Sequence, residues 1–129
     1  MPPRVHHLAV VVSDLVASER FYGEVLGMPV VRRWADEAGA PRSVWLGLDG
    51  GAFLAVERAG ARDGGRRDEA PGWHCVALAI EKGEREAVRA RLGAAGHPIE
   101  RASAFTLYVR DPDGNLVALS HWPDAADTP

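Results

Sequence analysis

Two histidines stand at matching places in the chain, each at the head of a short apolar segment. His7 precedes residues 8–12, and His74 precedes residues 75–80. Imidazole exchanges protons near neutral pH, so either ring is a candidate general base. The sequence shows no nucleophile beside either ring, so it does not identify catalytic residues. The rings become one candidate site if the segments that carry them line a shared cavity.

The segments around the two histidines follow one pattern. Each apolar segment is succeeded by a helical stretch that ends in Leu-Gly, at Leu26-Gly27 in the first half and at Leu92-Gly93 in the second. A repeat of this length indicates two copies of one supersecondary unit. The two histidines are therefore expected to occupy equivalent places.

Composition narrows the class of protein. The chain has 129 residues, of which 47% are hydrophobic, and a formal net charge of −3. Mixed charges do not resemble the basic stripe of a nucleic-acid-binding protein, and no apolar run approaches the ~20 residues that cross a bilayer. No signal-peptide pattern is seen, so a cytoplasmic protein is expected. Cys75 is the only cysteine, which excludes an internal disulfide.

The elements around each histidine predict an α+β fold of two tandem βαβββ modules. The first module spans residues 5–59: a strand over 5–12, a helix ending at Gly27, and strands over 30–34, 43–48 and 52–57. The second spans residues 73–122: a strand over 73–80, a helix over 83–92, and strands over 98–102, 104–109 and 116–121. A polar, glycine-rich stretch over residues 60–72 predicts a flexible linker. We expect these parts to form a single domain over residues 1–129, with a frayed tail after residue 122.

This order of motifs resembles the vicinal oxygen chelate superfamily, which includes glyoxalase I, extradiol dioxygenases, fosfomycin-resistance transferases and bleomycin resistance proteins. The matching pieces lie in order along nearly the whole chain: His7 through Asp14-Leu15, Phe21-Tyr22 with Val25-Leu26-Gly27, Gly72-Trp73-His74, and Asp111-Pro112-Asp113-Gly114-Asn115. The resemblance implies paired modules whose sheets curl into an open cup, and a homodimer. In many members the cup holds one divalent metal ion.

The resemblance also implies a candidate metal site. His7 and His74 match the ligand positions on the first strand of each module, where imidazole suits Fe, Mn, Ni or Zn. On the last strand of the first module, Ala55 stands at the family's ligand position if the motif is aligned on residues 54–56. Glu57 lies two residues further along the same face and is the candidate third ligand.

The last strand of the second module lacks the carboxylate that the family pattern implies. Ala118 occupies the place where members usually carry a glutamate, and alanine offers no donor. Ser120 shares its strand parity but is a poor ligand, and His121 is expected to point to the other face. This gap argues against glyoxalase, dioxygenase or fosfomycin-transferase activity.

Two functions remain open. The first is a small-molecule-binding protein with a degenerate or absent metal site, in which Trp34, Trp45 and Trp73 contact the ligand. Acidic residues would favour a cationic ligand in that case: Asp36, Glu37, Asp49 and Glu57. The alternative is a metal-dependent lyase or dioxygenase that uses His7, Glu57 and His74. The sequence does not name the ligand or substrate.

Overall fold

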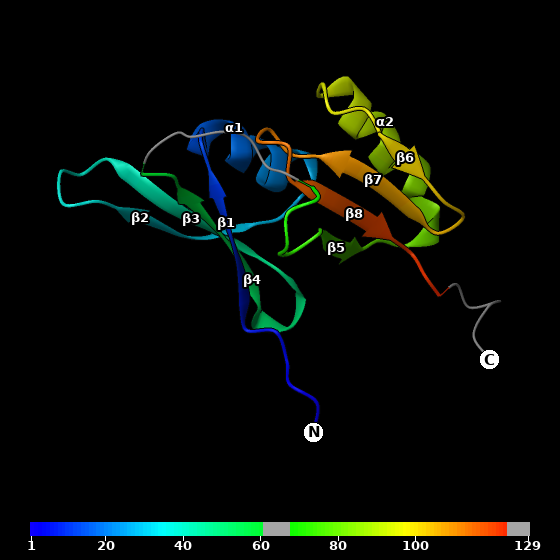
Figure 1. Ribbon diagram of the computed structural model, residues 1–129, viewed down its shortest axis with the longest axis horizontal. Coiled ribbons are helices and arrows are strands. Elements are labelled where there is room, and N and C mark those ends of the chain that lie inside the picture. The colour runs from blue at the N-terminus through cyan, green and yellow to red at the C-terminus, as the bar shows by residue number, and fades with distance from the viewer. Residues whose placement is uncertain (61–67, 124–129) are drawn as a thin grey trace. The chain divides into compact units, whose positions relative to one another are not determined.

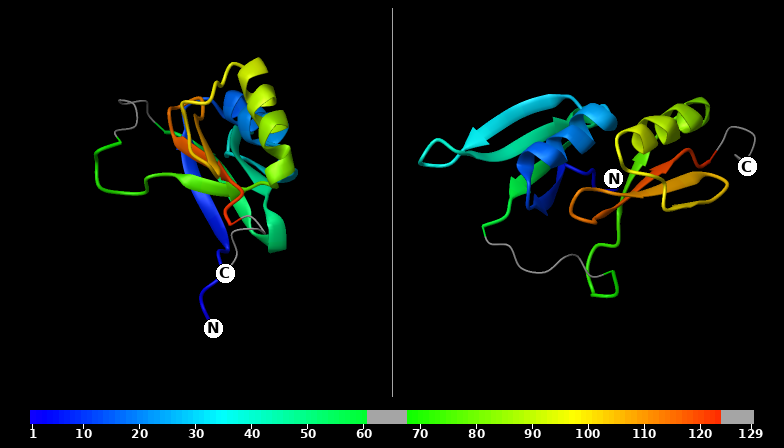
Figure 2. Two further views of the ribbon diagram at one scale, coloured as in Figure 1. Left: turned by 90° about the vertical axis from the view of Figure 1, so that its right-hand side faces the viewer. Right: turned by 90° about the horizontal axis from the view of Figure 1, so that it is seen from above.

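The computed structural model describes residues 1–60 and 68–123. It divides into two units, residues 1–64 (unit 1) and residues 65–129 (unit 2), each with one four-stranded sheet and a helix against it (Figures 1 and 2). Residues 61–67 of the predicted linker (60–72) and residues 124–129 of the predicted frayed tail lie outside the described residues. No helix in the described ranges is long and apolar enough to span a membrane.

Unit 1 has the order βαβββ. Its sheet is ordered β1-β4-β3-β2, with β1 parallel to β4 and the other pairs antiparallel. The parallel pair requires a crossover connection, in which α1 lies. The elements are β1 (His7–Val12), α1 (Leu15–Glu19), the π-helical turn η1 (Arg20–Val25), β2 (Val30–Ala35), β3 (Pro41–Gly47), the 3-10 turn η2 (Asp49–Gly51) and β4 (Phe53–Arg58).

Unit 2 repeats the same topology. Its sheet is ordered β5-β8-β7-β6, again with the first strand parallel to the last and the other pairs antiparallel. The elements are β5 (Val76–Ala79), the 3-10 turn η3 (Lys82–Glu84), α2 (Arg85–Ala94), β6 (Arg101–Ala102), β7 (Thr106–Arg110) and β8 (Leu116–Ser120). The α+β fold of two βαβββ modules predicted from the repeat is confirmed.

The first helix differs from the continuous α-helix that the apolar spacing predicts. After Glu19 the chain continues as a π turn, in which the Leu26 amide donates to the Phe21 carbonyl at 3.0 Å. The wider turn leaves two consecutive aromatic side chains, Phe21 and Tyr22, buried together with their rings in an edge-to-face contact. The apolar spacing alone does not predict this change of helix type.

Each sheet has a helix-facing side and a second side. In unit 1 the core forms between the helix residues Phe21 and Tyr22 and alternating strand residues: Val12, Val44, Leu46, Leu54 and Val56. In unit 2, Val88 and Leu92 of α2 belong to the core, with Leu107, Val109, Val117 and Leu119. Because side chains alternate along a strand, the intervening residues lie on the other side. The candidate site residues of unit 1 lie there.

Candidate functional site

Four aromatic side chains, one from each strand, share the side of the unit 1 sheet that faces away from the helix. His7 of β1 is paired in register with Phe53 of β4, and Trp45 of β3 is paired with Arg32 of β2. Trp34 follows Arg32 by two residues and therefore lies on the same side. We name these five residues the aromatic face: His7, Phe53, Trp45, Trp34 and Arg32.

The four rings form a continuous row. His7 stacks on Phe53, with ring centroids 4.9 Å apart and an interplanar angle of 6°. Phe53 in turn stacks on Trp45 at 4.3 Å and 20°, and Trp45 meets Trp34 at 5.3 Å and 60°. Such aromatic pairs stabilise by about 0.5–1.5 kcal/mol beyond the area they bury. The result is a broad apolar surface whose rings hold one another in place.

Nitrogen-containing groups stand at both ends of this row. The guanidinium carbon of Arg32 lies 4.0 Å from the centroid of the Trp34 ring. At the other end, Nδ1 of His6 lies 2.9 Å from Nδ1 of His7, so one of these two nitrogens donates and the other accepts. Within the described ranges no carboxylate lies within ion-pair distance of Arg32. The face thus carries a cation without a protein counter-charge.

Two buried polar atoms adjoin the row. Nε1 of Trp34 and Oγ of Ser43 are shielded from solvent, and neither has a hydrogen-bond partner among the described residues. Trp34 and Ser43 are paired in register between β2 and β3. A buried polar atom without a partner costs free energy, so each such atom in a native fold needs a physical explanation.

Glu57 lies on the same side of the sheet, but not beside His7. In register it faces Val11 on β1 and Ser43 on β3, whereas His7 faces Phe53. Val11 lies four residue steps after His7, which separates the two rows by about 13 Å along the strand direction. The structure therefore resolves the register of β4, and Ala55, paired with Ala9 and Trp45, lies between the two candidate ligands.

The unit 2 candidates lie before the first strand of their sheet. β5 begins at Val76. His74 and Trp73 therefore precede the strand, whereas the sequence predicted a strand that begins at Trp73. Both side chains are exposed, Trp73 to 87%. The rings of Trp34 and Trp45 contact each other in unit 1, and the roles of all four residues stay predictions.

The last strand of unit 2 offers few side chains that could ligate a metal ion. Ala118 is buried, and the Ser120 hydroxyl is hydrogen bonded to that of Thr106 at 2.9 Å. His121 is buried beside Arg85, whose Nη1 lies 3.2 Å from its Nε2. His121 thus contacts the helix-bearing side, as its strand parity predicts.

The predicted metal ligands of unit 1 do not cluster. Within residues 1–60 and 68–123, no three His, Cys, Asp or Glu side chains form a group that could hold a metal ion. Ala118, at the expected carboxylate position, supplies no donor. The strand register does not bring His7 and Glu57 together around one ion, and a metal-binding role for His7, Glu57 and His74 stays a prediction.

One expected attraction for a cationic ligand is weaker than the sequence suggests. The Arg58 guanidinium lies 3.0 Å from Asp36, and this hydrogen bond, with those from the Ala40 and Ala38 amides, lowers the pKa of the Asp36 carboxyl. The Asp36 carboxylate is thus already hydrogen bonded to amides of its own loop and to Arg58 of β4, so it attracts a cationic ligand less strongly.

Sequence reasoning missed three members of the site: Arg32, Ser43 and Phe53. The signal that could have found them was strand parity. Phe53 precedes Ala55 and Glu57 by steps of two, Ser43 precedes Trp45, and Arg32 precedes Trp34. Extending the alternation across all four strands would have gathered the whole face.

The two βαβββ units with sheets of identical strand order define the class: the fold is that of the vicinal oxygen chelate proteins. Residues 4–119 match the model of the Glyoxalase/Bleomycin resistance protein/Dioxygenase superfamily. Because this match covers most of the chain, the protein belongs to that superfamily.

Individual relatives agree with this assignment. Virulence protein STM3117 of Salmonella typhimurium is 30% identical over 127 residues, which cover 92% of this chain and 84% of the relative. The structure of SMU.1112c is 26% identical with a TM-score of 0.76, covering 92% of this chain and 98% of that one. The fold is shared by FosX of Listeria monocytogenes in a complex with Mn(II) and 1S,2S-dihydroxypropylphosphonic acid, at 18% identity, a TM-score of 0.73 and 93% coverage of each chain.

Proposed function

We propose that this protein is a small-molecule-binding member of the superfamily and holds a planar organic ligand on the aromatic face without a metal ion. The observation that carries the proposal is the row from His7 to Trp34 with the unpartnered Trp34 Nε1 and Ser43 Oγ beside it.

The chemistry of the face supports binding more than catalysis. Aromatic walls with a few oriented polar groups are typical of ligand sites, because the rings supply contact area and the polar atoms fix orientation. Glu57 lies on the same side of the sheet but outside the aromatic face, about 13 Å along the strands from His7. Glu57 and His7 are therefore too far apart to act as an acid–base pair on one atom of a bound molecule.

A fragment screen on metal-free protein tests the proposal. The protein is treated with a chelator, and its tryptophan indole N–H resonances are followed by NMR against neutral, cationic and anionic fragments. We expect aromatic fragments to shift the Trp34 and Trp45 resonances, assigned with Trp34→Phe and Trp45→Phe. Trp45→Ala should weaken binding by about tenfold or more, the usual cost of removing an aromatic anchor.

The control is Trp122→Ala, which removes an indole that is 68% exposed in unit 2. This substitution should leave fragment binding unchanged. Fragments that bind with the Trp34 and Trp45 resonances unmoved would contradict the proposal.

The alternative is a metal-dependent lyase or dioxygenase that uses His7, Glu57 and His74. It is favoured by one observation, that His7 and Glu57 lie on the same side of the sheet. Metal analysis of protein purified without chelator distinguishes the two functions. One divalent ion per chain that is lost in His7→Ala would replace the proposed function by the alternative. The expected homodimer is tested separately by sedimentation.

A further inference from the structure

We propose that the ligand of the aromatic face is an aromatic carboxylate and that Arg32 binds its carboxylate group. This inference rests on the proposed function and adds the charge of the ligand to it. Arg32 would then be the residue that determines specificity for anionic over neutral ligands.

Arg32 is held in place but not neutralised. Its guanidinium lies over the Trp34 indole at 4.0 Å, which leaves the N–H groups at the edge of the guanidinium available. The adjacent Arg33 is paired with Glu19, whereas Arg32 has no carboxylate partner in the described part of the chain. The planar guanidinium matches a carboxylate with two parallel hydrogen bonds. An anionic ligand group would therefore complete the pairing that the protein does not supply.

Trp34 Nε1 and Ser43 Oγ, the unpartnered atoms beside Arg32, can also donate hydrogen bonds to a ligand. The Trp34 indole N–H can only donate, and the Ser43 hydroxyl can donate to an oxygen. Both atoms lack a partner among the described residues, and both residues lie in register with each other next to the Arg32–Trp45 pair. Three potential donors at one end of the aromatic row favour a ligand that carries oxygens at that end. Because both atoms are shielded, the indole has to turn for a ligand oxygen to reach them.

Glu57 sets the direction in which such a ligand lies. It faces Ser43 in register and lies one row from Arg32, so it repels a carboxylate placed over β4. A carboxylate at Arg32 on β2, with the ring over Trp45 and Phe53, keeps the anion at the cationic end. Glu57 alone would favour a cationic ligand, and the experiment therefore includes one.

Four small probes separate ring from charge. They are naphthalene-2-carboxylate, its neutral carboxamide, 2-naphthylmethylammonium and cyclohexanecarboxylate, titrated by calorimetry into chelator-treated full-length protein. We expect the naphthalene carboxylate to bind at least tenfold more tightly than the other three and to shift the Trp34 indole N–H resonance. Arg32→Ala should remove that tenfold preference by weakening binding of the carboxylate far more than binding of the carboxamide, and Arg32→Lys should keep part of the preference.

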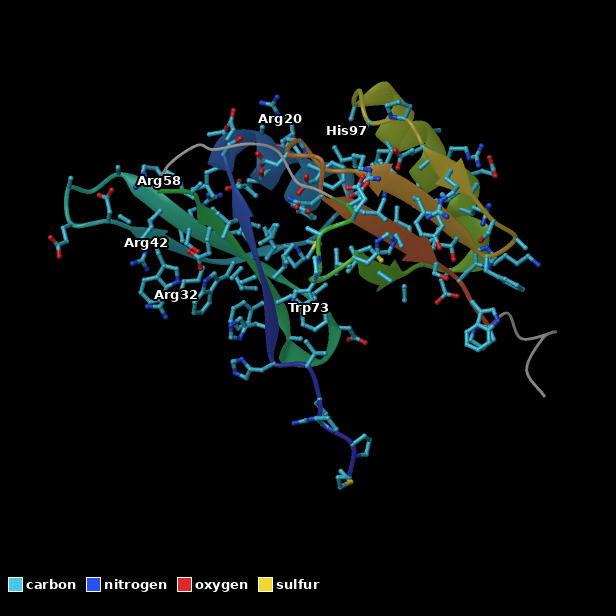
Figure 3. All side chains as sticks on the ribbon, viewed as in Figure 1. Arg20, Arg32, Arg42, Arg58, Trp73 and His97 are labelled. Atoms are coloured by element: carbon cyan, nitrogen blue, oxygen red, sulfur yellow. The ribbon has the colours of Figure 1, made fainter. Side chains whose placement is uncertain are left out.

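Arg20→Ala is the matched charge control. Arg20 is an exposed arginine of the same unit, on η1, and Figure 3 shows it on the helix side while Arg32 lies on the opposite side of the sheet. Its removal changes the net charge equally and should leave every affinity unchanged.

The outcomes separate this inference from the function beneath it. Equal affinity for carboxylate and carboxamide, tighter binding of the ammonium, or an Arg32→Ala effect equal for both naphthalenes would overturn the inference. If only other fragments move the Trp34 and Trp45 resonances, the ligand class is wrong and the proposed function stands. If neither the probes nor any fragment moves them, the proposed function fails too.

Discussion

At the scale of single residues, the buried Ser43 hydroxyl links stability to function. Its Oγ has no partner within the described residues, and a hydroxyl buried in this way destabilises the folded state. We expect Ser43→Ala to raise the free energy of unfolding by about 1 kcal/mol. The same substitution should weaken binding of naphthalene-2-carboxylate, since it removes a donor beside Arg32. Urea unfolding and calorimetry on one preparation measure both effects.

Ser18 provides a matched control for this prediction. It is also fully buried with an unpartnered Oγ, but it lies on α1 on the other side of the sheet. Ser18→Ala should stabilise the protein by a similar amount and leave binding unchanged. A Ser43→Ala variant that is less stable, or that binds the probe as tightly as the parent, would refute the role given to Ser43.

The ion pair between Arg33 and Glu19 predicts a pH dependence of stability. The hydrogen bond from Arg33, at 2.9 Å to Oε2, lowers the pKa of the Glu19 carboxyl below its ordinary value. A lowered pKa in the folded state contributes stability that is fully present above the unfolded pKa and is lost as the pH falls through the folded pKa. Because Arg33 is 59% exposed, solvent screening limits this contribution to about 0.5 kcal/mol.

Arg33→Ala should therefore lower the free energy of unfolding by about that amount at pH 7 and low salt. At pH 3 the difference from the parent should be smaller than at pH 7, because the contribution of the ion pair is lost as the pH falls through the lowered pKa of Glu19. Glu19→Gln should lower stability at pH 7 in the same way. Urea unfolding at both pH values measures the difference, and one that grows on acidification would contradict the assignment.

At the scale of elements, two five-residue turns use the same hydrogen bonds. In the turn after β7, the Asp111 carboxylate accepts from the Asp113 and Asn115 amides, and in the turn after β2 the Asp36 carboxylate accepts from the Ala38 and Ala40 amides. Both turns have glycine at the fourth position, with φ of 84° at Gly39 and 85° at Gly114. The aspartate fixes the turn by replacing solvent as the acceptor for two backbone amides.

Asp111→Ala is expected to cost about 2 kcal/mol of stability, because the turn loses the buried Asp111 carboxylate as acceptor and its contact with the Asn115 side chain. Asp111→Asn keeps one oxygen as acceptor and should cost about half as much. Thermal unfolding of the two variants and the parent measures the order. Equal stability of all three would show that the turn is fixed by its backbone alone.

The sequence predicts elements better than their exact contacts. The order of the elements along the chain and the helix end at Leu26-Gly27 follow from local spacing, and both are seen. The second predicted end is wrong, because α2 continues through Leu92-Gly93 to Ala94. The π turn does not follow, because it depends on burying Phe21 and Tyr22 together against a sheet formed later in the chain. The late start of β5 has the same origin, since only residues from Val76 onward pair with β8. Local patterns thus predict which segments extend, and tertiary pairing decides where they begin.

The site divides in the same way. Trp34 and Trp45 could be singled out because tryptophan is rare and bulky. Their alignment with Phe53 and His7 depends on the register of β4, which the short apolar segment 52–58 leaves undecided. Arg32 becomes a candidate ligand-binding residue only because it has no carboxylate partner among the described residues. That is a property of packing, and no sequence motif predicts it.

At the scale of the whole molecule, the repeat produces two units with separate sheets and cores. Every strand pairing recorded in the described residues stays within one unit, β1–β4 in unit 1 and β5–β8 in unit 2. Leu46 and Leu107 each lie on the third strand of their unit, and both are fully buried. They provide a matched pair of substitutions that probes whether stability is shared between the units.

We expect Leu46→Ala and Leu107→Ala each to cost about 3 kcal/mol, the usual loss for a cavity in a packed core. Because each core leucine packs against its own helix and sheet, the loss of amide-exchange protection should be confined to the substituted unit. Native-state hydrogen exchange resolved by residue measures this. Leu46→Ala should speed exchange in β3 and β4 and leave β7 and β8 unchanged, and Leu107→Ala should do the reverse. Equal acceleration in both sheets by either substitution would show that the duplicated units unfold as one cooperative structure.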